Sequence, residues 1–185
     1  MKFSRKLLCC GLLLILASSG LEYVWGKGGI APAYAGQDAE RSSRNFVQAF
    51  YTWYVPKHGV EDVLKYRRTA LSPELFRALK EDLDASAKNS DEVVGLDFDP
   101  FLNAQDTAER YVIGSVTAKG DTSWVEVYGI WSGKKSEKPD AVAEVACKAG
   151  QCFFVNFHYG KTELPENENL LSVLKALKKE RQKHP

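Results

Sequence analysis

The spacing of the apolar residues changes once along the chain, near Tyr111. Before this point they recur at helical spacing, and the clearest example is an aromatic stripe that ends at Pro56. After it they alternate as in β-strands: residues 111–118 lead into a turn sequence at 119–121, and residues 122–131 follow as a second strand. Because helices followed by a run of strands are typical of α+β domains, we predict an antiparallel sheet with helices on one face.

The remaining segments extend this pattern. A short helix is expected near residues 60–64, and a longer one from residues 72–74, where a hydroxyl that can cap the helix precedes a proline and an acid. After a polar loop at 132–140, two more strands are expected over 141–147 and 152–159. The last helix has an apolar side formed by Leu170, Leu171, Leu174 and Leu177. The expected fold is α+β: N-terminal helices on one face of a curved antiparallel sheet of about four strands, and a C-terminal helix.

Residues 1–19 have the composition of a signal peptide. Three basic residues within the first six precede an apolar stretch of eleven residues, 7–17, and this stretch is shorter than the roughly 20 residues of a membrane-spanning helix. Small residues at 17–19 predict cleavage after residue 19, and a second such pattern lies at 33–35. We therefore predict a periplasmic protein, with anchoring in the inner membrane through an uncleaved N-terminus as the alternative.

The rest of the chain is predicted to form one domain. Residues 20–37 are rich in Gly, Ala and Pro and are expected to be a flexible linker, followed by a single α+β domain at 38–185. From residue 36 onward the chain carries 21 basic and 23 acidic side chains. This balance gives no electrostatic support for nucleic-acid binding. We expect an unknown protein partner or small ligand in the cell envelope, and no transmembrane domain in the mature protein.

Two cysteines, Cys147 and Cys152, lie beyond the predicted signal peptide. They flank a turn-like tetrapeptide between two expected strands, a position where a hairpin brings paired residues close enough for a disulfide. A redox-active pair is the alternative, but the spacing is C-x4-C rather than C-x-x-C. We predict a structural disulfide, and neither a metal site nor a cofactor, since a metal needs more ligands than this pair supplies.

Residues 97–106 form a segment that core-and-surface patterning alone does not explain. Asp97, Asp99, Asn103, Gln105 and Asp106 supply three carboxylates and two amides beside two phenylalanines. These five residues are candidates for binding a ligand or partner, and oxygen-rich loops of this kind can also hold Ca²⁺. A structural role is the favoured interpretation: Asp99 can cap a turn, the amides can bond to the backbone, and the phenylalanines can fill the core.

A second set of candidates is expected on the sheet. Trp124, Tyr128, Asn156 and His158 could line an apolar pocket between the sheet and the helices. Ordinary core packing is the competing interpretation for the aromatic residues, and a single strand histidine is more often packed or solvated than functional. No nucleophile–base motif or metal motif accompanies these residues in the sequence.

Several segments resemble the domain of unknown function 3828 family. They are FVQAFYTWYV at 46–55, LSPEL at 71–75 and DFDPFLNAQD at 97–106, and the resemblance extends over about residues 42–175. It implies an exported envelope protein of Gram-negative bacteria, with a fold similar to the cone-shaped α+β domains of the nuclear transport factor 2 type. It supplies no established activity, and a shared fold would not imply a function.

Three functions follow as hypotheses. The first is a non-enzymatic periplasmic binding or protein-interaction module. The second is a small-cavity enzyme of the same fold that uses an acid or base such as Asp99 with His158. The third is an inhibitor or immunity-type protein that blocks a partner enzyme.

Overall fold

The structure is a computed structural model that describes residues 32–56, 59–88, 95–161 and 167–183, with the side chains described from residue 37 onward. The predicted signal peptide and most of the predicted linker lie outside these residues. The described part belongs to one compact unit that begins at residue 31.

In the part of the chain that the structure describes, four α-helices and one 3₁₀ helix frame the sheet. They are α1 (Pro32–Tyr54), α2 (Val60–Tyr66), η1 (Arg68–Ala70), α3 (Pro73–Lys88) and α4 (Leu170–Lys183). The hydroxyl of Ser72 accepts a hydrogen bond from the Leu75 amide at 3.2 Å and caps α3 as expected. The first helix begins earlier than predicted, because residues 32–37 of the expected linker belong to α1. A proline is well tolerated at this first helical position, since no intrahelical bond needs its missing N–H.

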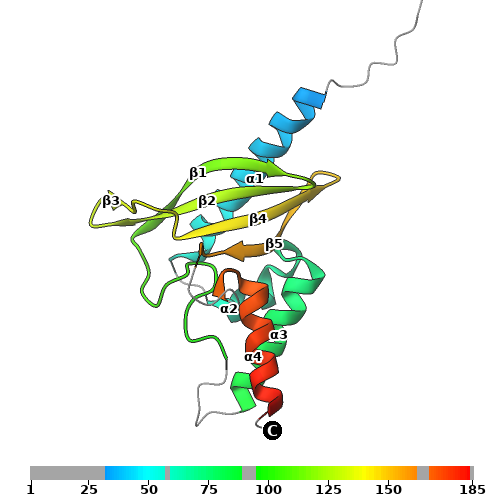
Figure 1. The fold of residues 1–185 in the computed structure, drawn as a ribbon. Helices are drawn as coiled ribbons and strands as arrows, with labels where there is room; N and C mark the ends of the chain where they lie inside the picture. The colour runs from blue at the N-terminus through cyan, green and yellow to red at the C-terminus, as the bar shows by residue number, and fades with distance from the viewer. Residues whose placement is uncertain (1–31, 57–58, 89–94, 162–166, 184–185) are drawn as a thin grey trace, which may run out of the picture. The chain divides into compact units, whose positions relative to one another are not determined.

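The sheet contains β1 (Arg110–Lys119), β2 (Thr122–Trp131), β3 (Lys134–Lys135), β4 (Ala141–Lys148) and β5 (Gln151–His158). All pairs are antiparallel, in the order β1-β2-β4-β5, and the two-residue β3 pairs with the end of β2. The α+β prediction is confirmed: helices come first, a curved antiparallel sheet follows, and a helix ends the chain (Figure 1).

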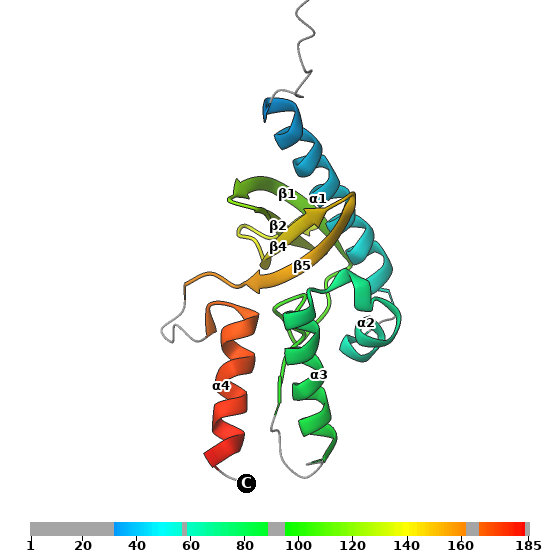
Figure 2. The ribbon, with the colours of Figure 1, turned by 90° about the vertical axis from the view of Figure 1, so that its right-hand side faces the viewer.

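The helices take two different places around the sheet. Helix α1 crosses one face of the sheet, whereas α2, α3 and α4 gather beyond β5 (Figures 1 and 2). We call the face that packs against α1 the inner face and the opposite one the outer face. In Figure 1 the outer face is turned toward the viewer, and no helix covers β2 or β4 there.

The core lies between α1 and the inner face. The buried apolar residues of α1 are Val47, Phe50, Tyr51 and Tyr54, and they pack with Val125 and Val127 of β2 and with Phe154 and Phe157 of β5. The Phe50 ring centre lies 4.8 Å from that of Phe154 and 5.4 Å from that of Phe101. The aromatic stripe of α1 therefore fills the core rather than forming a ligand site. Within the described residues, no helix is long and apolar enough to span a membrane.

Candidate functional site

The polar segment at 97–106 is organised by one carboxylate. Asp99 Oδ1 accepts hydrogen bonds from the Phe101 and Leu102 amides at 2.9 and 3.1 Å, and its Oδ2 accepts one from the Tyr54 hydroxyl at 2.6 Å. The backbone of the segment also closes on itself, because the Asp99 amide donates to the Ala104 carbonyl at 3.0 Å. All four hydrogen bonds connect Asp99 to other groups of this protein, so Asp99 stabilises the turn and joins it to α1.

The two amide side chains of this segment also bond to backbone. Asn103 has a left-handed backbone (φ 51°), which Asn tolerates better than most residues, and its Nδ2 donates to the Asp140 carbonyl at 3.0 Å. Gln105 Nε2 donates to the Asp97 carbonyl at 3.5 Å. Asp97 and Asp106 are exposed, and no group of three metal-ligating side chains forms among the described residues. The structural interpretation thus accounts for Asp99, Asn103 and Gln105.

Burial and nearby phenols set the electrostatics around Asp99. Burial raises the pKa of Asp99, while the hydrogen bonds from Tyr54 and from two backbone amides act in the opposite direction. Burial, followed by the charge of Asp99, raises the pKa of Tyr54 well above its ordinary value. Two more buried phenols bond to the same turn, Tyr51 to the Phe101 carbonyl and Tyr159 to the Pro100 carbonyl. These tyrosines stay protonated and act as donors.

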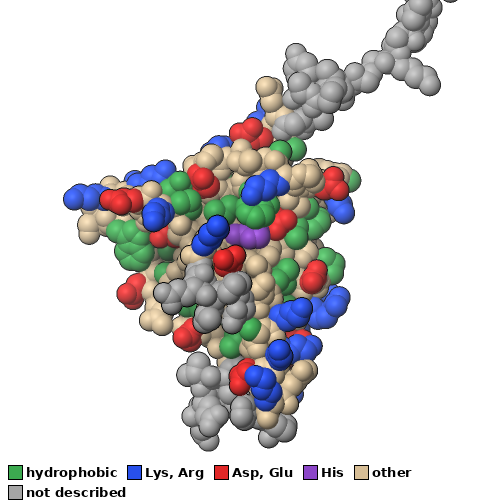
Figure 3. All heavy atoms as spheres, in the orientation of Figure 1, with side chains coloured by type: hydrophobic (Ala, Val, Ile, Leu, Met, Phe, Trp, Pro, Cys, Tyr) green, Lys and Arg blue, Asp and Glu red, His purple; other side chains and the backbone are tan. Residues whose placement is uncertain are grey.

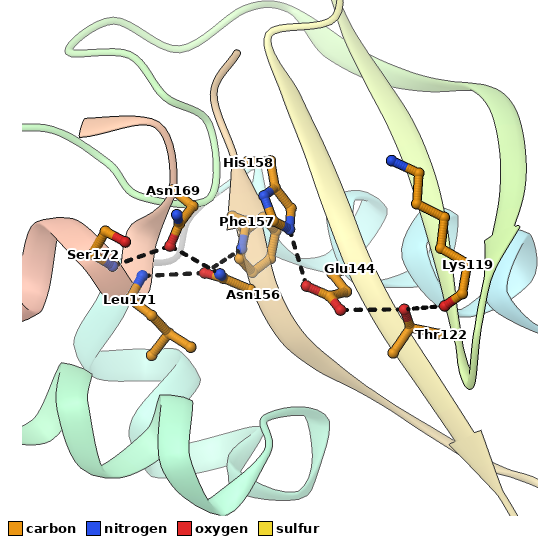
Figure 4. A network of polar contacts seen from close by, with 9 residues as sticks. All are labelled: Lys119, Thr122, Glu144, Asn156, Phe157, His158, Asn169, Leu171 and Ser172. Atoms are coloured by element: carbon orange, nitrogen blue, oxygen red, sulfur yellow. Dashed lines mark hydrogen bonds and ion pairs between the residues drawn. The ribbon is translucent and has the colours of Figure 1, made fainter. Parts of the chain in front are cut away.

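The four residues expected around a pocket lie in different surroundings. Asn156 is buried beside the start of α4: its Nδ2 donates to Asn169 Oδ1 at 3.0 Å, and its Oδ1 accepts the Leu171 amide at 3.1 Å (Figure 4). Asn169 in turn accepts the Ser172 amide at 3.0 Å and caps α4. Asn156 therefore positions a helix, which corrects its expected place in a pocket.

Trp124 and His158 lie together on the outer face instead of between the sheet and α1. Their rings are stacked, with centres 3.9 Å apart and planes 21° from parallel. His158 Nε2 lies 2.9 Å from Glu144 Oε2, and the other oxygen of Glu144 accepts the Thr122 hydroxyl at 3.2 Å (Figure 4). Lys119 Nζ is 3.4 Å from the Trp124 ring centre.

Tyr128 belongs to a separate outer-face cluster. Its hydroxyl donates to Glu126 Oε2 at 3.0 Å, and Lys135 Nζ lies 3.5 Å from its ring centre. Ser115 donates its hydroxyl and amide hydrogens to the same Glu126 oxygen, and the hydroxyl bond is the main reason that the pKa of Glu126 is lowered. The polar groups of both outer-face clusters are thus bonded within the sheet. Asp99 and His158, the pair expected for an enzyme, share no hydrogen-bond partner.

The disulfide prediction is confirmed. Cys147 and Cys152 are paired residues of β4 and β5 and are bonded across the turn. Ala149 and Gly150 form this turn with φ values of 50° and 80°. Cys147 Sγ also lies 3.5 Å from the Ser43 hydroxyl of α1, so the hairpin end contacts the first helix.

A groove along α3 is the site that sequence reasoning missed. It has a volume of about 950 Å³ and is lined mainly by α3, with residues of η1 at one end and one residue of α4. Its basic side chains are Arg68, Arg77, Lys80, Lys88 and Arg181, its acidic ones are Glu81 and Asp84, and its apolar ones include Leu71, Pro73 and Phe76. We call it the basic groove. Figure 3 shows Lys and Arg side chains gathered over α3 and α4.

Ion pairs neutralise the acids of the basic groove but not all of its cations. Lys80 pairs with Asp84 at 2.7 Å and Lys178 pairs with Glu81 at 2.8 Å. Arg68 lies over the Phe76 ring, 4.7 Å from its centre. Arg77 and Lys88 are exposed and make no ion pair with any described residue. The groove therefore has a positive surface beside an apolar one.

Local sequence signals could not reveal this groove. Arg77, Lys80 and Lys88 look like an ordinary solvated helix face. Arg68 belongs to η1, which directly precedes α3, whereas Arg181 comes from α4, and only the packing of α4 beside α3 brings Arg181 to the groove.

In comparisons with known proteins, no family model, no curated protein and no solved structure matches this chain.

Proposed function

We propose that this protein is an exported, non-enzymatic binding or protein-interaction module of the cell envelope, and that the basic groove is its binding site. The single observation that carries the proposal is the groove itself: a hollow of about 950 Å³ in which Arg77 and Lys88, which make no ion pair with a described residue, lie beside apolar side chains. Concave sites that combine apolar surface with a few convergent charges are where ligands and peptide segments bind.

The other candidate residues support this choice because they already make hydrogen bonds within the fold. Asp99 uses both carboxylate oxygens to hold a turn. Glu144 and Glu126 each accept hydrogen bonds from neighbouring outer-face residues. A ligand at any of these positions would have to replace bonds that already exist, whereas a ligand in the basic groove would gain contacts with Arg77 and Lys88.

A binding role also fits the carboxylate and histidine chemistry better than catalysis does. A general acid or base must reach a substrate within hydrogen-bond distance. Asp99, whose pKa is raised by burial, is half-buried and uses both carboxylate oxygens for hydrogen bonds within the fold. His158 lies on the outer face against Trp124 and Glu144. The two groups therefore offer no common place for a reacting molecule.

The envelope location rests on the sequence of the first 19 residues and on the resemblance to the family named above, and the Cys147–Cys152 bond is compatible with it. Disulfides form and persist in oxidising compartments.

Site-specific photocrosslinking in intact cells tests the proposal. A photoreactive amino acid replaces Thr69, which lines the basic groove, and in a matched strain replaces Thr117, an exposed threonine of β1. We expect a discrete crosslinked product from position 69 alone, and we expect the additional change Arg77→Glu to remove it. Products of the same mass and yield at both positions, or no product at position 69, would contradict a binding role for the groove.

A further inference from the structure

We infer that the basic groove takes an acidic, extended protein segment that carries one apolar side chain. The inference rests on the proposed function and specifies the partner's chemistry. Its basis is charge complementarity along a groove of defined length, together with the apolar surface at one end.

The charge distribution selects an acidic partner. Five basic and two acidic side chains line the groove, and both acids already have lysine partners. Residues 36–185 as a whole carry slightly more acidic than basic groups, so the positive groove is a local feature and not a reflection of net charge. Local fields of one sign steer ligands of opposite charge and set which partners are accepted.

The apolar lining favours a partner that carries an apolar side chain in addition to its negative charges. Leu71, Pro73 and Phe76 lie toward the N-terminal end of α3, and the Arg68 guanidinium lies over the Phe76 ring. Apolar side chains seated in a pocket, with charges around them, are the usual energetic centre of a protein interface. An aliphatic side chain of the partner would rest on Phe76, and its carboxylates would reach Arg77 and Lys88.

The dimensions favour a peptide segment over a membrane. The lining residues of α3 run from Pro73 to Lys88, about 22 Å at roughly 1.5 Å per residue. An extended segment of about seven residues covers that length at roughly 3.3 Å each. A flat bilayer surface would touch only the rim of a concave groove and would not reach its apolar lining.

The test uses defined peptides and the mature protein. The probe is a fluorescein-labelled peptide of about seven residues, all glutamate except for a leucine next to one end, so that the leucine can rest on Phe76 while glutamates reach Lys88. One control peptide has glutamine in place of every glutamate, and a second has serine in place of the leucine. Binding is followed by fluorescence anisotropy at low and at high salt. We expect the probe to bind, with affinity falling as salt rises, and each control peptide to bind about tenfold more weakly or worse.

Matched variants locate the binding. Arg77→Glu reverses an exposed charge without a described ion-pair partner, Lys88→Glu does the same at the other end of α3, and Lys134→Glu reverses an exposed charge on β3, outside the groove. Thermal unfolding followed by circular dichroism shows whether each variant is folded. We expect Arg77→Glu and Lys88→Glu to weaken probe binding about tenfold, and Lys134→Glu to leave it unchanged.

Other outcomes overturn the inference in distinguishable ways. Equal binding of the acidic and glutamine peptides, or loss of binding with Lys134→Glu as well, excludes an acidic segment in this groove. Equal affinity for single-stranded DNA or for vesicles with an anionic lipid shows a general polyanion surface and overturns the inference in favour of those partners. If the peptides fail while position 69 still gives its crosslink, the partner chemistry is wrong and the proposed function stands. If both fail, both are wrong.

Discussion

The Tyr54 hydroxyl donates a hydrogen bond to Asp99 Oδ2 at 2.6 Å and so ties the last residue of α1 to the turn that precedes the sheet. Tyr54 is buried and Asp99 is half-buried, and the second oxygen of Asp99 is bound by backbone amides. This contact explains why the segment at 97–106 is structural: its central carboxylate binds the protein's own donors.

Removal of the Tyr54 hydroxyl should destabilise the fold. In the variant Tyr54→Phe, Asp99 Oδ2 loses its phenol donor in a site that water reaches poorly, and we expect the free energy of unfolding to fall by about 2 kcal/mol. Tyr66→Phe is the matched control, because Tyr66 is 59% exposed. Urea unfolding measures both. A Tyr54→Phe variant as stable as Tyr66→Phe would show that the contact contributes nothing.

The pKa of Asp99 predicts a pH dependence of stability. Burial raises this pKa above its ordinary value of 3.8. Between the two values the folded state holds the proton and the unfolded state has released it, so the free energy of unfolding falls as the pH rises through this window. Asp99→Asn removes the titrating group.

Urea unfolding of the wild type and of Asp99→Asn at a series of acidic pH values checks this sign. We expect the wild type to lose stability relative to the variant as the pH rises from below 3.8. A relative gain would mean that the hydrogen bonds to Asp99 outweigh its burial.

The elements that the sequence predicted correctly are those whose signals are local. The hydroxyl–proline–acid pattern at 72–74 marks the start of α3, and the spacing of Cys147 and Cys152 around a turn predicts their bond. The start of α1 was predicted too late. Residues 32–37 belong to a Gly- and Ala-rich segment that indicates a linker, and the helical spacing of apolar residues begins only after it. The alternation of residues in β2 correctly placed Trp124 and Val125 on opposite faces of the sheet. Alternation alone, however, does not show which of the two faces packs against the helix.

The candidate site could not be predicted for a different reason. Arg181 joins Arg77 at the groove only when α4 packs beside α3. Charged residues on separate helices carry no shared spacing in the sequence. The oxygen-rich residues at 97–106 were candidates for a binding site because they are close together in sequence. In the structure, their central carboxylate, Asp99, binds donors of the protein itself.

The start of α4 should depend on an asparagine that the sequence analysis did not single out. Asn169 Oδ1 accepts the Ser172 amide and the Asn156 side chain, each at 3.0 Å (Figure 4). Asn169→Ala removes the cap and should lower the free energy of unfolding by about 1 kcal/mol. Asn167→Ala, an exposed change two residues earlier, is the matched control. Equal stabilities in chemical unfolding would argue against this cap.

Reduction of the disulfide should weaken the fold without abolishing it. The bond closes a short loop between residues five apart in sequence, and the chain-entropy model gives about 2 kcal/mol for such a loop. Urea unfolding with and without a reductant measures the difference. The double variant Cys147→Ser/Cys152→Ser should start at the lower stability and show no response to the reductant; a response would point to another effect of the reductant.

The ion pair between Arg181 and Asp82 should be the main polar link that holds α4 against α3. Arg181 Nη1 lies 2.6 Å from Asp82 Oδ1, and the Asp82 side chain is only 6% exposed. Among the described residues, loss of the arginine leaves this buried carboxylate with the Leu96 amide as its donor. We expect Arg181→Ala to lower the free energy of unfolding by about 3 kcal/mol. Lys178→Ala breaks the neighbouring exposed pair with Glu81 and should cost about 0.5 kcal/mol.

The double variant Arg181→Leu/Asp82→Leu tests how much of the loss in Arg181→Ala comes from the unpaired charge of Asp82. It removes both charges from a poorly hydrated position, so we expect it to recover much of the stability that Arg181→Ala loses. Chemical unfolding of the three variants and the wild type measures these differences. If Arg181→Ala were no more disruptive than Lys178→Ala, the Arg181–Asp82 pair would not hold α4, and the apolar contacts of Leu170 and Leu174 would have to do so alone.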